Sequence, residues 1–104
     1  MFAVPPKVSI SSSFGDDPLQ AGDLAQLQCT VAQGDTPVQI TWSFQGFDAS
    51  LNTQHGIQIK KFGHRSSILM IESVSAENSG VYVCTGSNHA GIANYTVSLK
   101  INGS

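Results

Sequence analysis

Two cysteines and three histidines are the side chains in this sequence best suited to chemistry. Cys29 and Cys84 could form a disulfide, act as a redox pair or remain buried thiols, and they lack the close C-x-x-C spacing of redox and zinc sites. His55, His64 and His89 fall in expected loops at no ligand spacing. We therefore expect solvated histidines, no metal site and no cofactor.

Carboxylates and serines add no catalytic arrangement. Asp16 and Asp17 are the one adjacent acidic pair, and neighbours in an extended segment point apart, which suits neither acid–base catalysis nor a metal clamp. The serines have no histidine that the expected fold would bring near as a base. The sequence thus favours a protein that is not an enzyme.

Length and charge restrict the class of partner. The 104 residues fit a single domain, and a formal charge of −2 with 12% charged residues argues against nucleic-acid binding. No apolar run approaches the roughly 18 to 20 residues that span a bilayer, and residues 1–3 do not resemble the start of a secretory signal. We interpret residues 1–104 as one domain of a longer chain, with 1–5 and 102–104 as linkers.

The strands that must position the cysteines follow a period of two residues. Residues 25–31 alternate through Cys29, residues 82–84 end at Cys84, and residues 38–44 alternate through Trp42. A cysteine, a strand tryptophan and Tyr-x-Cys form the arrangement in which a disulfide joins two sheets and the indole packs against it. This setting favours a Cys29–Cys84 disulfide with Trp42 and Tyr82 in the core. Because such bonds persist in oxidising compartments, it also predicts a secreted or cell-surface protein.

Segments with these patterns resemble an immunoglobulin domain. GDLAQLQC, ITW and NSGVYVC are similar to its strands B, C and F, and the short spacing between the cysteines is typical of the intermediate set. The resemblance implies an all-β, two-sheet Greek-key sandwich with one inter-sheet disulfide, and it places Tyr82 at the family's tyrosine corner. Further strands are expected at 7–13 (A), 56–60 (D), within 66–74 (E) and at 94–101 (G), with a hairpin turn at 88–91.

The segment SSILMIESV, residues 66–74, has large apolar side chains on both phases of a strand. If Leu69 and Ile71 face the core, Ile68 and Met70 point out of the sheet, and the opposite register would expose the other pair. Neutral hydrogen-bonding groups dominate the neighbouring outward positions. An apolar centre with a polar rim is typical of a protein interface. The predicted interface comprises Gln26, Gln28, Thr30, Gln58, Lys60, Ile68 and Met70, bordered by Lys7, Ser9 and Ser11.

Longer motifs suggest a narrower family. VPPKV, FGDDP, GDTPVQITW, LMIESVSAENSGVYVC and SNHAG resemble the alternatively spliced variable immunoglobulin domains of the insect Down syndrome cell adhesion molecule family, the seventh most closely. In that family these domains pair with identical copies on an opposing cell, the seventh through its A-B-E-D face in an antiparallel, two-fold manner. The resemblance implies homophilic, isoform-specific self-recognition on the outside of a membrane-anchored protein, with an identical domain as partner.

Two other roles remain open from the sequence. The domain could bind a different protein through the C-F-G face, where Gln39, Thr41, Ser43, Val81 and Val83 are expected to point outward. Alternatively, it could be a passive spacer in a rod of domains, with Ile68 and Met70 covered by a neighbour in the same chain.

Asn94-Tyr95-Thr96 has the letters of a glycosylation acceptor, as does Asn102-Gly103-Ser104. Asn94 is expected to point outward because Tyr95, Val97, Leu99 and Ile101 take the core phase of the last strand. The alternative interpretation of Asn94 is an ordinary polar surface residue.

Overall fold

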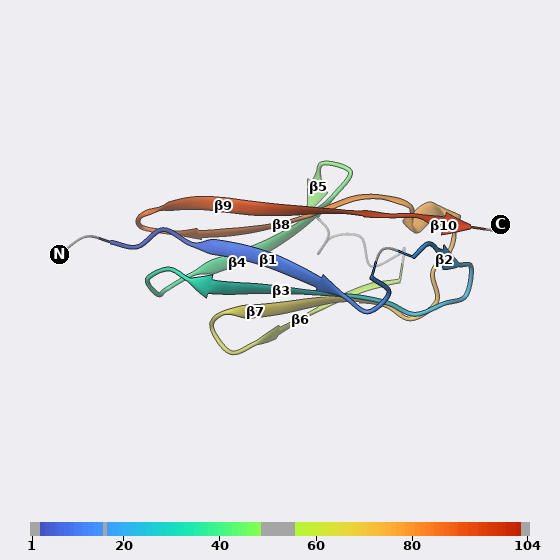
Figure 1. The fold of residues 1–104 in the computed structure, drawn as a ribbon, viewed down its shortest axis with the longest axis horizontal. Helices are drawn as coiled ribbons and strands as arrows, with labels where there is room; N and C mark the ends of the chain where they lie inside the picture. The colour runs from blue at the N-terminus through green and yellow to red at the C-terminus, as the bar shows by residue number, and fades with distance from the viewer. Residues whose placement is uncertain (1–2, 16, 49–55, 103–104) are drawn as a thin grey trace.

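The computed structural model describes residues 3–15, 17–48 and 56–102, and its strands form two packed sheets (Figure 1). His55, Asp16 and the Ser104 of the second acceptor motif lie outside the described residues. The first sheet comprises, in the order of its neighbouring strands, β1 (Lys7–Ser12), β3 (Ala25–Gln33), β7 (Ser66–Ile71) and β6 (Ile57–Phe62). The second comprises, in the same way, β5 (Phe47–Asp48), β4 (Gln39–Phe44), β8 (Gly80–Asn88) and β9 (Gly91–Leu99). The predicted immunoglobulin-like sandwich is confirmed.

A short parallel pair at one end of the molecule was not expected from the sequence. After β1, the chain turns and β2 (Leu19–Gln20) pairs in parallel with β10 (Ile101–Asn102). The amide of Leu19 donates to the carbonyl of Lys100 at 2.9 Å. The last strand was expected at 94–101, but β9 begins at Gly91, and Lys100 separates it from β10. The early start follows from the turn, where the Asn88 side chain accepts from the amide of Gly91 at 3.1 Å.

The disulfide connects the centres of the two sheets. Cys29 of β3 is bonded to Cys84 of β8, and both side chains are fully buried, which confirms the predicted pairing. Trp42 lies directly opposite Cys84 in the pairing of β4 with β8. Its indole Nε1 donates to the buried Ser67 Oγ at 3.0 Å, so the sheet that carries Cys29 supplies the partner that the buried N–H needs.

Tyr82 anchors the crossing between the sheets. The crossing contains the 3-10 helix η3 (Ala76–Asn78), and the Tyr82 hydroxyl donates to the carbonyl oxygen of Asn78 at 2.7 Å. Its ring stacks on Phe44 with 4.5 Å between centroids. Burial raises the pKa of the Tyr82 phenol, and a hydrogen bond with the Asn78 side chain lowers it by less. The phenol is therefore a neutral donor that ties β8 to η3.

Replacement Tyr82→Phe should lower the free energy of unfolding by about 1–3 kcal/mol, because it leaves a buried carbonyl without its donor. Stabilisation by the neutral phenol is present below its ordinary pKa of about 10 and is lost as pH rises toward the raised pKa in the fold. Urea unfolding at neutral and alkaline pH measures both effects. Equal alkaline dependence in the variant and the wild type would contradict this role of Tyr82.

Gly86 of β8 leaves space for the core side chains of Val8 and Val31. A Cβ at this position would lie 2.8 Å from Val8 Cγ2 and 3.3 Å from Val31 Cγ2. Both valines are buried, so neither methyl can move into solvent. Glycine at this position therefore permits the close approach of the two sheets.

Gly86→Ala is expected to destabilise the domain by about 1–3 kcal/mol through overpacking. Gly91→Ala is the matched control, since its Cβ would meet only Pro5 Cβ, at an ordinary contact distance of 3.6 Å. Chemical unfolding followed by Trp42 fluorescence compares the two variants. A loss of stability that is the same for both would show that close packing at Gly86 is not the cause.

The described ends of the chain lie at opposite ends of an elongated body of 53 by 26 by 22 Å (Figure 1). Residues 4–6, which precede β1, pack against the domain. The amide of Asp35 donates to the Val4 carbonyl at 3.1 Å, the Asn88 side-chain nitrogen donates to the same carbonyl at 2.8 Å, and Pro6 is buried.

Candidate functional site

The register of β7 decides which of its apolar side chains reach the surface. Leu69 and Ile71 are buried in the core together with Ser67. Ile68 and Met70 lie on the opposite phase and are half-buried on the outer side of the first sheet. Ser67 favours the register in which Leu69 and Ile71 face inward, because it then faces inward too and its hydroxyl accepts the hydrogen bond from the Trp42 indole.

Side chains from β3 and β6 flank this apolar pair in two cross-strand rows. Ile68 lies between Gln28 and Lys60, and Met70 lies between Gln26 and Gln58. We call the outer side of this sheet the Ile68–Met70 face. Thr30 and Ser66 form its next row, and Lys7, Ser9 and Ser11 are exposed along β1 at its border. The residues predicted for the interface therefore lie on one contiguous surface: Gln26, Gln28, Thr30, Gln58, Lys60, Ile68 and Met70.

Phe62 belongs to the same surface and was missed from the sequence. It is 49% exposed, and the Lys60 Nζ lies 5.7 Å from the centre of its ring. Phe62 shares the outward phase of Gln58 and Lys60, but the strand was expected to end at residue 60, which excluded it. Together these strands enclose a shallow hollow of about 190 Å³ lined by Gln26, Gln58, Lys60, Phe62, Ile68 and Met70.

The charges on this face are separated along the strands. Lys60 lies beside Ile68, and Lys7 lies further toward the same end. Glu72 is exposed and follows β7 immediately, beyond Met70 at the other end. The apolar pair therefore lies between a basic end and an acidic end of the face.

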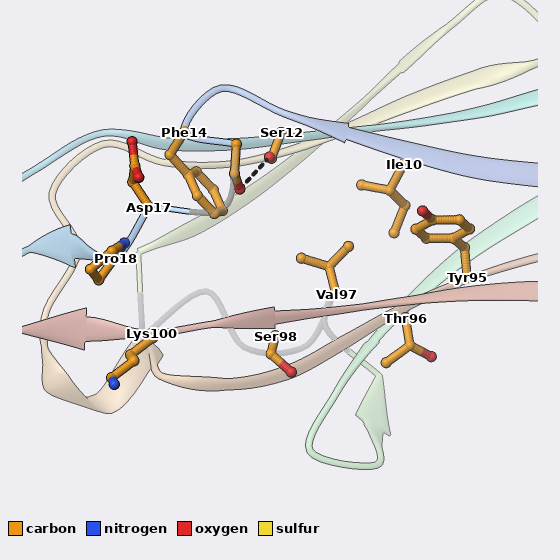
Figure 2. A pocket seen from close by; sticks show the side chains of 11 residues that line it. Ile10, Ser12, Phe14, Asp17, Pro18, Tyr95, Thr96, Val97, Ser98 and Lys100 are labelled. Atoms are coloured by element: carbon orange, nitrogen blue, oxygen red, sulfur yellow. Dashed lines mark hydrogen bonds between the residues drawn. The ribbon is translucent and has the colours of Figure 1, made fainter.

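A larger groove of about 590 Å³ lies between β9 on one side and β1 with Phe14, Asp17 and Pro18 on the other (Figure 2). Tyr95 and Val97 point into it from β9, toward Ile10, while Thr96 and Ser98 point to the other side of the strand (Figure 2). Tyr95 was expected on the core phase of the last strand, and the structure places it on that phase. It is nevertheless 43% exposed, because its ring lies in this open groove.

The outer side of the second sheet carries the residues predicted for the alternative C-F-G face. Gln39, Thr41 and Val81 are exposed there, and Ser43 and Val83 are half-buried. Ile92, which was not predicted, is 74% exposed. Within residues 3–15, 17–48 and 56–102, no three His, Cys, Asp or Glu side chains are close enough to hold a metal ion, and no helix there is long and apolar enough to cross a membrane.

Comparison with known families gives the chain its class. The model of the immunoglobulin I-set domain matches residues 8–101. The chain belongs to the immunoglobulin I-set family. Immunoglobulin I-set domains are adhesion or structural modules, and this domain is not an enzyme.

Relatives of this I-set domain occur in cell adhesion molecules. It is 36% identical over 99 residues to the cell adhesion molecule Dscam1 of Drosophila melanogaster and 36% identical over 87 residues to the cell adhesion molecule DSCAML1 of Homo sapiens. These matches cover 95% and 84% of this chain, but only 5% and 4% of those proteins. The crystal structure of the Dscam1 Ig7 domain, isoform 5, superposes with a TM-score of 0.88 at 38% identity, covering 97% of this chain and all of that one. The expected similarity to the seventh domain is confirmed.

Proposed function

We propose that this domain pairs with a second copy of itself through the Ile68–Met70 face, within a larger cell-adhesion molecule on the cell surface. The observation that carries the proposal is the apolar pair at the centre of the face, flanked by neutral hydrogen-bonding side chains. Such a centre and rim are typical of protein interfaces. The relatives named as cell adhesion molecules support an adhesive role for the parent protein.

Two-fold pairing would use every side chain of the face twice. Ile68 and Met70 are already half-buried, so pairing could supply only part of the about 1.5–3 kcal/mol that full burial of an exposed side chain contributes. The ordering costs of association oppose this gain. One domain should therefore bind weakly. A mismatched substitution in the rim is counted twice in a symmetric contact, which favours pairing between identical variants over pairing between different ones.

The separation of charge supports an antiparallel arrangement. When two copies meet with their β7 strands antiparallel and the apolar pair near the two-fold axis, Glu72 of one copy faces the basic end of the other. A parallel arrangement would instead oppose like charges at both ends. Charge complementarity of this kind selects orientation and register more than it adds affinity.

The parent molecule would supply the rest of the adhesion strength. Several weak, matched domains on one chain bind together with an avidity that exceeds the affinity of each. The disulfide between Cys29 and Cys84 fits an extracellular position, because such bonds are maintained in oxidising compartments. The elongated body, with its described ends far apart, fits a domain that is one segment of a longer series.

Dilution of the ¹⁵N-labelled domain, followed by amide NMR shifts, tests where any contact lies. We expect concentration-dependent shifts in β7, β3 and β6, centred on Ile68 and Met70. Shifts confined to β8 and β9 would favour the second sheet, where Val81 and Ile92 are exposed. Amide resonances that do not move with concentration would contradict self-pairing and favour the spacer role.

A further inference from the structure

The outer side of the second sheet differs from the Ile68–Met70 face in having a polar middle. Thr41, Thr85 and Asn94 are cross-strand neighbours in β4, β8 and β9. Val83 and Thr96 form part of the next row. Among the side chains of this sheet that the structure describes, Ile92 is the most exposed large apolar one, and it lies two residues before Asn94 on the same phase of β9. Asn94 therefore lies near the middle of the length of β9, the edge strand of this sheet, with Ile92 beside it on the same phase.

Asn94 and Thr96 are presented together on this surface. Both side chains are exposed, and they flank Tyr95, which points the opposite way into the groove (Figure 2). Among the residues that the structure describes, the Asn94 side chain makes no hydrogen bond, so the fold does not require its amide. Asn-x-Ser/Thr, with x other than proline, is the acceptor motif for N-linked glycans, and tyrosine satisfies it.

We propose that Asn94 carries an N-linked glycan that covers the outer face of the second sheet. In this transfer the Asn94 Nδ2 bonds to the anomeric carbon of an oligosaccharide held on an isoprenoid diphosphate. The bond from that carbon to the diphosphate oxygen breaks, the isoprenoid diphosphate leaves, and the amide loses one proton to a base of the transferase. The same secretory compartment that forms the Cys29–Cys84 bond provides this donor.

The glycan covers the outer side of the second sheet and leaves the Ile68–Met70 face free for protein contacts. A bulky, hydrated group at Asn94 lies over Thr85 and beside Ile92, and it obstructs protein docking to β8 and β9. The Ile68–Met70 face has no acceptor motif, since the two motifs of the sequence begin at Asn94 and Asn102. This consequence rests on the proposed function, in which the Ile68–Met70 face, without a glycan, is the surface used for self-pairing. The modification itself stands independently of it.

Secretion of the domain from a glycosylating eukaryotic host, followed by intact mass measurement before and after peptide N-glycosidase, tests the site. We expect a glycan mass that Asn94→Gln and Thr96→Ala abolish, whereas Thr96→Ser retains the motif and the glycan. Asn102→Gln should leave the mass added at Asn94 in place. Unmodified Asn94 in the secreted, disulfide-bonded domain would overturn the proposal.

Sedimentation of the glycosylated domain beside its Asn94→Gln variant tests the consequence. Equal dimer dissociation constants for the two forms would support a glycan that lies away from the pairing face. Dimerisation only in the variant without glycan would overturn the assignment of faces while leaving the modification in place. Monomers in both forms, with Asn94 modified, would contradict the proposed function and leave the glycan site standing.

Discussion

Replacement of Cys29 and Cys84 together by alanine is expected to lower the free energy of unfolding by about 4 kcal/mol. The two residues are separated by 55 positions, and opening so long a loop restores much entropy to the unfolded chain. Domains of this size are stable by only about 5–15 kcal/mol, so the loss is a large part of the total. Urea unfolding of the variant, followed by Trp42 fluorescence, measures it.

The wild-type domain, reduced and alkylated in the unfolded state, provides a second comparison, because it also lacks the bond. Unalkylated wild type that is reduced and then reoxidised is the control for the chemical treatment and should regain full stability. A loss below about 1 kcal/mol in the double alanine variant would contradict a fold that depends on this link. It would mean that the buried strands around Trp42 and Tyr82 hold the two sheets together by packing alone.

The double substitution Ile68→Asp, Met70→Asp is expected to weaken self-association by at least about 100-fold, which corresponds to about 2.8 kcal/mol. It removes both apolar groups at the centre of the face and replaces them with charges. In a two-fold dimer each change occurs twice, so four carboxylates would lie close together at the contact. Calorimetric dilution of the concentrated domain measures the dissociation constant and the heat of dissociation.

Ile92→Asp is the matched control, because it makes the same kind of change at a strongly exposed position of the other sheet. It should leave the dissociation constant unchanged. Circular dichroism and unfolding curves must show that the double variant keeps its fold, as expected for side chains on the outer side of β7. An effect of Ile92→Asp that equals or exceeds that of the double substitution would move the contact to the second sheet.

The sequence was sufficient to predict the central strands and the disulfide. Cys29, Trp42 and Cys84 lie in strands buried on one side and open on the other, and such strands show a clear period of two. The short pair of β2 and β10 lacked this pattern, since two-residue strands cannot show a period. Its position depends on hydrogen bonds between residues about 80 positions apart in the chain, which local patterns do not encode.

The candidate site was predictable in its centre and less so at its margins. The outward phase of Ile68 and Met70 follows from alternation, as do their cross-strand neighbours once the sheet order is given. Phe62 was lost through an error of two residues in the end of β6, the kind of boundary that patterns define least well. Tyr95 has the expected core phase but is 43% exposed, because phase tells which side a residue faces and not how completely that side is covered.

Sedimentation equilibrium of the purified, oxidised domain from low micromolar to millimolar concentration tests the central claim of self-pairing most directly. The account predicts a reversible monomer–dimer equilibrium that is weak, limited to two copies, and absent in the Ile68→Asp, Met70→Asp variant. A single monomer mass throughout that range would contradict it, and so would association that the double substitution leaves intact.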